Sequence, residues 1–102
     1  MSDTVKWSSY DFYVLPKESA WHAVGGVYIF TGKNAQGLWY PLYIGQAESL
    51  AARIPTHERW QEAARLGATH VHAMVVQQEA NRDTIERELI AAYQPTLNEH
   101  HK

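Results

Sequence analysis

The pattern of apolar and polar residues along the chain predicts several short elements. Two β-rich runs, residues 27–30 and 38–44, flank a polar loop bounded by Gly32 and Gly37. Such runs on either side of such a loop are typical of an antiparallel β-hairpin. Pro41 lies inside the second run, and proline within a strand indicates an edge strand or a bulge that shifts the register.

Helical patterns follow the predicted hairpin. Ser49 is suited to cap a short helix that ends at residue 54, and Thr56 is suited to cap a second helix that ends at residue 66. Gly67 suits the position directly after the second helix, where a left-handed backbone is common. We therefore expect two short helices after the hairpin.

The last third of the chain predicts one strand and one longer helix. Residues 70–76 alternate as a strand does, and residues 81–93 carry a helical stripe. The helix is expected to end before Pro95, because proline pushes the preceding residue out of the helical region. The expected element order is therefore β-β-α-α-β-α, which is typical of a small α+β domain.

We divide the chain into an extension, a domain and a tail. The first 24 residues carry several aromatic side chains without a sustained period, and we expect them to pack on the domain as an N-terminal extension. The domain spans residues 25–98, and residues 99–102 form a polar tail. The whole length of 102 residues fits one globular domain.

Composition narrows the possible classes of protein. The chain has no cysteine, which excludes a disulfide scaffold and a thiolate metal site and favours a reducing, cytoplasmic setting. Its longest apolar stretch is far below the roughly 20 residues of a membrane span, so no membrane association is expected. The net charge of −2 predicts no polybasic surface. A nucleic-acid partner must therefore be argued from a site.

Tyr28 and Tyr43 lie on opposite sides of the hairpin loop. With the loop centred near residue 35, Tyr28 pairs with a residue near position 41, and Tyr43 lies two residues beyond that partner. Side chains alternate along a strand, so both phenols are expected on one face as diagonal neighbours. They either pack on the sheet or belong to a site.

Glu86 lies at the border of the apolar stripe formed by Ile85, Leu89 and Ala92. This position predicts a half-buried carboxylate, which needs a cation, a hydrogen-bond donor or a metal ion as its partner. A capping box formed with Asp83 is the alternative, if the helix begins late.

Other polar residues leave a structural and a functional interpretation open. Arg53 and His57 are four residues apart, but Pro55 lies between them, so helical spacing does not bring them together. His70 and His72 have a spacing on one strand face that suits a transition metal. No third ligand is apparent, and we expect these two histidines on the polar face of an edge strand.

In combination, these motifs resemble the GIY-YIG nuclease superfamily over residues 25–98. The matching residues are Gly26-Val27-Tyr28, Tyr43-Ile44-Gly45, Arg53, Glu86, Leu89-Ile90, Pro95 and Asn98. In the family the arginine stands ten residues after the second tyrosine, and the glutamate precedes the Leu-Ile pair by three residues, as in this chain. The order and spacing make the resemblance specific.

The resemblance implies a three-stranded sheet, antiparallel or mixed, flanked by helices. It also implies phosphodiester hydrolysis with one divalent metal ion, Mg²⁺ or Mn²⁺, held by Glu86. One protein carboxylate leaves the remaining coordination to water and substrate, which suits Mg²⁺. Arg53 is implied to bind the charge that develops on the phosphoryl oxygens. His57 stands where some members place a histidine and others a tyrosine.

The remaining motif residues receive roles from the same resemblance. Tyr28 is implied as the general base, which requires positive charge to stabilise its phenolate, and Tyr43 holds a phosphate oxygen or a bound water. The roles of the two tyrosines could be exchanged. Gly45 is structural, and Asn98 is implied to pin the C-terminal segment by hydrogen bonds.

Substrate contacts are expected from few basic residues. Arg59 lies near the motif residues, and Lys33 comes from the hairpin loop. Gln46 follows Gly45 where the excision-repair members carry a lysine, and Glu48 adds negative charge nearby. One phosphate-binding cation is therefore missing, which predicts low substrate affinity.

Three functions are considered. The first is a metal-dependent endonuclease acting on DNA, structure-directed or weakly specific, with RNA left open and a protein partner as a source of specificity. The second is a catalytically weak or inactive nucleic-acid-binding module, or a partner-dependent subunit, on the same fold; the net charge favours it. The third is a structural protein in which the tyrosines and Glu86 merely pack. The complete set of motif residues favours the first.

Overall fold

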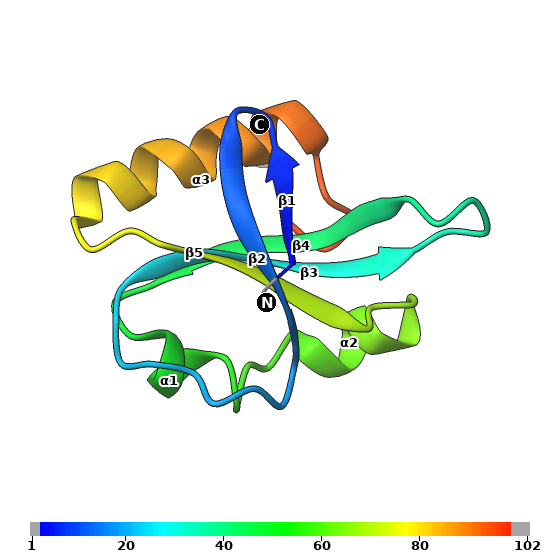
Figure 1. Ribbon diagram of the computed structural model, residues 1–102, viewed down its shortest axis with the longest axis horizontal. Helices are drawn as coiled ribbons and strands as arrows, with labels where there is room; N and C mark the ends of the chain where they lie inside the picture. The colour runs from blue at the N-terminus through cyan, green and yellow to red at the C-terminus, as the bar shows by residue number, and fades with distance from the viewer. Residues whose placement is uncertain (1–2, 99–102) are drawn as a thin grey trace.

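The computed structural model describes residues 3–98 and shows an α+β fold built on one five-stranded antiparallel sheet (Figure 1). The elements, in chain order, are β1 (Thr4–Trp7), β2 (Tyr10–Pro16), β3 (Gly26–Lys33), β4 (Trp39–Ala47), α1 (Leu50–Arg53), α2 (Trp60–Arg65), β5 (His70–Val75) and α3 (Glu79–Tyr93). Across the sheet the strands follow the order β1-β2-β5-β3-β4. No helix in residues 3–98 is long and apolar enough to cross a membrane.

Each face of the sheet has its own core. Helix α3 covers one face, which we call the α3 face, while α1 and α2 cover the opposite α1/α2 face (Figure 1). Val27 and Ile29 of β3 pack with Leu89 on the α3 face, whereas Tyr28 and Phe30 belong to the other core. Because alternate residues of a strand point to opposite faces, a strand covered on both sides is apolar throughout.

The N-terminal residues form two strands of the sheet. Strands β1 and β2 make a hairpin, and β2 pairs with β5. The expectation of a three-stranded sheet was therefore wrong, and the observed order is β-β-β-β-α-α-β-α. Burial of Trp7 and Phe12 on the α3 face anchors this hairpin. The division into an extension before residue 25 and a domain after it stays a prediction, and the expected tail at 99–102 lies outside the described residues.

The β3–β4 hairpin has the expected direction but a different register. Tyr28 pairs with Gly45, four residues beyond the predicted partner, because the hairpin turns about residue 36 and the register shifts by one residue near Pro41. Strand β4 is also an edge strand, so both features expected from Pro41 occur. Tyr43 is still two residues from the partner of Tyr28. The two tyrosines are therefore diagonal neighbours, as predicted.

The two short helices follow their predicted caps in part. The Ala52 backbone N–H donates to Ser49 Oγ at 3.2 Å, which caps α1 as predicted. Helix α2 begins at Trp60 rather than near Thr56, and its last residue is Arg65. Gly67 follows two residues later, and its φ of +109° confirms the expected left-handed position after the helix.

Helix α3 begins two residues earlier than expected. Its first residue is Glu79, so Asp83 and Glu86 both lie inside the helix. The capping-box alternative for these two residues is therefore wrong. Leu89 is buried as predicted, whereas Ala92 is exposed and Arg82 is buried in its place on the inner side of the helix.

Strand β5 lies inside the sheet, between β2 and β3. His72 is fully buried, and its Nδ1 accepts a hydrogen bond from Trp7 Nε1–H at 2.9 Å. Burial lowers the pKa of His72 to about 4. The expectation of an edge strand with His70 and His72 on a polar face was wrong, because the N-terminal hairpin covers that edge.

The last described residues cover the free edge of β4. Asn98 Nδ2–H donates to the Ile44 carbonyl, and Asn98 Oδ1 accepts from the Ile44 N–H, both at 2.8 Å. The Leu97 N–H donates to the Leu42 carbonyl at 2.8 Å. Asn98 thus satisfies edge-strand backbone groups that a neighbouring strand would otherwise pair.

Candidate active site

The two motif tyrosines lie together on the α1/α2 face. Their ring centroids are 6.4 Å apart, and Tyr28 is only 1% exposed while Tyr43 is half-buried. Gly45 makes room for the inner phenol, since a Cβ at this position would lie 2.6 Å from Tyr28 Oη. Any side chain at residue 45 would displace the Tyr28 hydroxyl.

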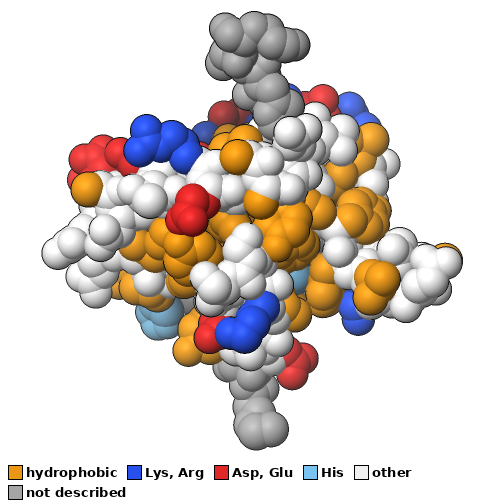
Figure 2. All heavy atoms as spheres, turned by 90° about the horizontal axis from the view of Figure 1, so that it is seen from above, with side chains coloured by type: hydrophobic (Ala, Val, Ile, Leu, Met, Phe, Trp, Pro, Cys, Tyr) orange, Lys and Arg blue, Asp and Glu red, His pale blue; other side chains and the backbone are white. Residues whose placement is uncertain are grey.

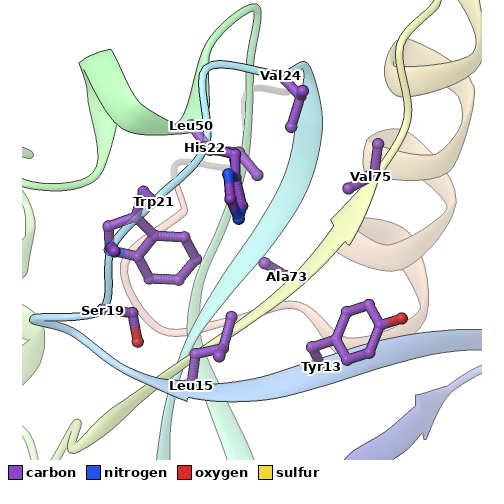
Figure 3. A pocket seen from close by; sticks show the side chains of 10 residues that line it. Tyr13, Leu15, Ser19, Trp21, His22, Val24, Leu50, Ala73 and Val75 are labelled. Carbon is purple, nitrogen blue, oxygen red and sulfur yellow. The ribbon is translucent and has the colours of Figure 1, made fainter. Parts of the chain in front are cut away.

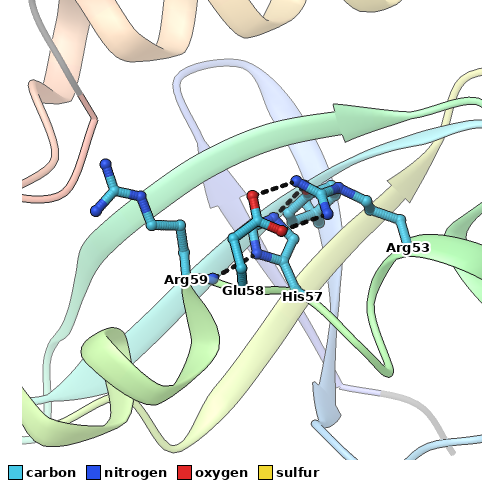
Figure 4. A network of polar contacts seen from close by, with 5 residues as sticks. Arg53, His57, Glu58 and Arg59 are labelled. Carbon is cyan, nitrogen blue, oxygen red and sulfur yellow. Dashed lines mark hydrogen bonds and ion pairs between the residues drawn. The ribbon is translucent and has the colours of Figure 1, made fainter.

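His57 is held against Tyr28 in one tautomer. Its Nε2 lies 2.8 Å from Tyr28 Oη, and its Nδ1 accepts the Arg59 backbone N–H at 3.0 Å (Figure 4). A backbone N–H can only donate, so the neutral ring carries its proton on Nε2 and donates it to the phenol oxygen. His57 therefore leaves the phenol proton of Tyr28 free for another acceptor.

Arg53 is engaged by a carboxylate in this structure. Its Nη1 and Nη2 donate to the two carboxylate oxygens of Glu58 at 2.7 and 3.0 Å (Figure 4). This ion pair lowers the pKa of Glu58 to about 2. Glu58 was not singled out in the sequence, because it pairs with Arg53 across the turn that Pro55 introduces. The pair is held by two parallel N–H···O bonds, as an arginine–phosphate contact would be.

Burial dominates the electrostatics of this group. It raises the pKa of Tyr28, and the charge of Arg53 acts in the opposite direction. Burial likewise raises the pKa of Tyr43, again against Arg53. Burial, with the positive charge of Arg53, lowers the pKa of His57 to about 4. At neutral pH the site therefore contains neutral phenols, a neutral imidazole and a permanent cation.

Glu86 reaches this site from the other face of the sheet. It is half-buried on α3, as the sequence predicted, and its carboxylate raises the pKa of both Tyr28 and Tyr43. Its own pKa is raised by burial and by Asp83, while a hydrogen bond from Gln46 lowers it. The charges of Arg53 and Glu86 thus both act on the two phenols, and the charge of Arg53 also acts on His57.

The two expected substrate-binding residues lie in different places. Arg59 is near the site, where its charge lowers the pKa of His57, and its Nη1 donates to Glu62 at 2.7 Å. Lys33 lies away from the tyrosines, with Nζ 4.7 Å from the centroid of the Trp39 ring, which packs on the α3 face. The structure does not bring Lys33 to the site.

A shallow depression next to His57 was not expected. It has a volume of about 500 Å³ and is lined by Lys17, Trp60 and Glu58 among others. Lys17 Nζ lies 5.4 Å from the Trp60 ring centroid and donates to the Pro55 carbonyl at 3.2 Å. Lys17 precedes the motif region, so no motif spacing could have identified it. It adds a basic residue beside the motif residues.

A second pocket on the α1/α2 face is apolar. It has a volume of about 260 Å³, and the side chains of Trp21, His22, Leu15 and Tyr13 surround it between β2, β5 and the loop that follows β2 (Figure 3). No motif residue lines it. This pocket is therefore separate from the candidate active site.

Charged side chains do not gather on the α3 side of the molecule. In the view from above, basic and acidic side chains alternate around apolar areas, with no broad basic field among the coloured residues (Figure 2). This distribution agrees with the net charge of −2. Contact of a polyanion with this face would therefore depend on a few local cations.

The described residues fit a metal site with one or two carboxylate ligands. Glu86 and Asp83 both receive hydrogen bonds from Gln46 Nε2, so their oxygens lie close together, and Asp83 raises the pKa of Glu86. A divalent cation would relieve that repulsion. Residues 3–98 contain no group of three or more histidine, aspartate or glutamate side chains placed to hold a metal. Water and substrate oxygens would have to complete the coordination.

Comparison with solved structures identifies similar domains. One is a point mutant of the GIY-YIG N-terminal endonuclease domain of UvrC from Thermotoga maritima, bound to its catalytic divalent cation, with 30% identity, a TM-score of 0.64, and coverage of 79% of this chain and 89% of that chain. The same domain with magnesium as the catalytic cation shows 29% identity, a TM-score of 0.65, and coverage of 78% and 89%.

A further point mutant of that domain has 28% identity and a TM-score of 0.66, with coverage of 79% of this chain and 89% of the other. No family model and no curated protein matches the chain. The similarity therefore rests on three-dimensional structure together with the motif residues.

Proposed function

The chain belongs to the GIY-YIG endonuclease family, and from this premise we propose that it is a metal-dependent endonuclease that hydrolyses phosphodiester bonds in DNA. The observation that carries the proposal is that Tyr43 and His57 both contact Tyr28, with the charges of Arg53 and Glu86 acting on both phenols. We propose Mg²⁺ as the cofactor, with Mn²⁺ as a substitute, and structure-directed or weakly specific cleavage. A cytoplasmic location and a protein partner that supplies specificity belong to the same proposal.

Glu86 would hold the cation, and Asp83 stands beside it. When bound, a divalent cation supplies positive charge against the scissile phosphate. Arg53 would exchange Glu58 for that phosphate, because a carboxylate and a phosphate each offer two oxygens to its two N–H donors. Tyr43 is half-buried and is therefore placed to contact a phosphate oxygen at the surface.

Tyr28 is proposed as the general base, with His57 as its positioning residue. The His57 Nε2–H donates to Tyr28 Oη, which stabilises a phenolate and fixes the ring. Burial opposes this role by raising the pKa of Tyr28, so positive charge from Arg53 and from the cation is required to offset it. The phenol proton then leaves toward water, and the phenolate accepts a proton from the attacking water.

A catalytically weak or partner-dependent binding module is the second candidate. It is favoured by the ion pair between Arg53 and Glu58, which occupies the phosphate-binding donors, and by the net charge of −2. A partner or a distorted substrate would then have to supply the binding energy that displaces Glu58.

Incubation with supercoiled plasmid, branched DNA and RNA, each with Mg²⁺ or Mn²⁺, tests the proposal. The wild-type protein should cleave DNA, whereas Glu86→Ala should not. Glu79→Ala is the matched control, because it removes an exposed carboxylate from the first turn of the same helix. Equal cleavage by all three proteins would indicate a contaminating nuclease. Binding without cleavage by the wild type would support the second candidate.

A further inference from the structure

We propose that Gln46 and Arg82 are positioning residues that orient Glu86 for its cation. This inference rests on the proposed function, and it concerns residues that the family motif does not include. Gln46 belongs to β4, and Arg82 belongs to α3, four residues before Glu86. The two side chains meet between the sheet and the helix.

Arg82 is a buried cation whose Nε and Nη1 both donate hydrogen bonds. It is 5% exposed, and its Nη1 donates to the carbonyls of Val76 at 3.1 Å and Gln77 at 2.8 Å. Its Nε donates to Gln46 Oε1 at 3.0 Å. Because the carbonyls fix the guanidinium, the guanidinium in turn fixes the side-chain amide of Gln46.

Only one orientation of the Gln46 amide satisfies its neighbours. The Arg82 Nε–H can only donate, so it requires the amide oxygen, and the Nε2–H₂ group must face the opposite side. There it donates to Asp83 Oδ1 and, at 3.4 Å, to Glu86 Oε1. One amide thus connects a buried cation to two carboxylates of the same helix.

A glutamine is suited to this position, and a lysine is not. A lysine at residue 46 has no oxygen to accept the Arg82 Nε–H, and its ammonium group would add a second positive charge beside the guanidinium. Arg82 does not contact substrate, because it is buried, but it holds the group that holds Glu86.

Metal binding without DNA tests this inference directly. Binding of Mn²⁺ is measured by electron paramagnetic resonance of the free ion, for the wild type, Gln46→Met and Arg82→Met. Loss of a partner that orients a metal ligand typically weakens metal binding by about 10- to 100-fold. We expect this loss in both variants and no further loss in the double variant, because the two residues act as one unit.

Arg87→Met is the matched control. Arg87 is exposed on the same helix, and its charge lowers the pKa of Glu86, but the structure records no hydrogen bond from it to Gln46 within residues 3–98. If only charge matters, both arginine variants should tighten Mn²⁺ binding. A positioning role instead predicts that Arg82→Met weakens Mn²⁺ binding, whereas Arg87→Met does not.

Gln46→Lys adds a test of the like-charge argument. It should weaken Mn²⁺ binding in the presence of Arg82, and Gln46→Lys combined with Arg82→Met should recover part of the loss. Wild-type Mn²⁺ affinity in folded Gln46→Met, with folding checked by circular dichroism, would overturn the inference. Unchanged Mn²⁺ affinity in Glu86→Gln would instead overturn the proposed metal site itself.

Discussion

Two arginines lie in polar clusters beside the site: Arg53 pairs with Glu58 in a surface cluster, and Arg82 contacts Gln46 in a buried cluster. The two clusters differ in solvent exposure, and this difference decides whether an arginine can exchange its partners. On the α1/α2 face, Arg53 pairs directly with Glu58 at the surface, with 38% and 67% of the two side chains exposed. On the α3 face, Arg82 is buried and meets its carboxylates only through Gln46. An exposed ion pair opens at little cost, whereas a buried cation cannot lose its partners cheaply. The surface cluster is suited to substrate exchange, and the buried cluster to rigid positioning.

The largest effect is expected from Glu86, on which the buried cluster acts. Glu86→Gln keeps the shape of the side chain but removes its charge, so cleavage should fall by at least about 100-fold, as loss of metal catalysis costs several kcal/mol. The free energy of unfolding should change by less than about 0.5 kcal/mol. Plasmid cleavage and urea denaturation measure the two quantities. A large loss of stability with retained cleavage would contradict the metal-ligand role.

The pH dependence of stability allows a comparison of one buried histidine from each face, His57 and His72. Folding lowers the pKa of both His57 and His72 to about 4, below the value of about 6.5 in an unfolded chain. The unfolded state then binds more protons between pH 6.5 and 4, so stability is complete above this window and decreases as pH falls through it. Each histidine should contribute about 3 kcal/mol to this decrease.

Urea denaturation at several pH values between 7 and 4 measures this decrease. His72→Gln should remove the contribution of His72 to the loss of stability at low pH. The amide oxygen of glutamine still accepts from Trp7 Nε1–H, but the amide does not titrate. A free energy of unfolding that stays constant between pH 6.5 and 4.5 would show that neither histidine is held neutral by folding.

Removing each arginine sharpens the comparison between the clusters. Arg82→Met leaves the carbonyls of Val76 and Gln77 without their donor and should cost about 1–3 kcal/mol of stability. Arg53→Met removes an exposed ion pair and should cost less than about 1 kcal/mol. Thermal or chemical denaturation of both variants measures the difference. Equal losses would mean that exposure does not distinguish the two clusters.

The smallest effect is expected from Glu58. Glu58→Gln removes the carboxylate that competes with phosphate for Arg53, so DNA affinity should rise by about two- to fivefold, the equivalent of an exposed ion pair of up to about 1 kcal/mol. Fluorescence anisotropy without divalent metal measures binding. Glu79→Gln is the matched control, since it removes an exposed carboxylate from the start of α3, which covers the opposite face of the sheet. An equal rise in both variants would indicate a general charge effect.

The sequence by itself determined the motif residues and the relation between the two tyrosines. Tyr28 and Tyr43 are diagonal neighbours although the predicted register was four residues off, because Tyr43 still lies two residues from the partner of Tyr28. The same alternation of side chains along a strand predicts that Lys33 does not share a face with Tyr28. Lys33 is five residues from Tyr28, and an odd separation along a strand places two side chains on opposite faces.

Only the tertiary structure decided the sheet and the two arginine clusters. The N-terminal strands have no clear period, and pairing of β2 with β5 made β5 an inner strand and buried His72. The sequence pattern of the helix predicts a surface position for Arg82. Only the folded structure shows its contact with Gln46, which is 36 residues away in the chain. Local patterns report which face a residue occupies, but a hydrogen bond between distant residues depends on how the elements pack, and packing is a property of the whole chain.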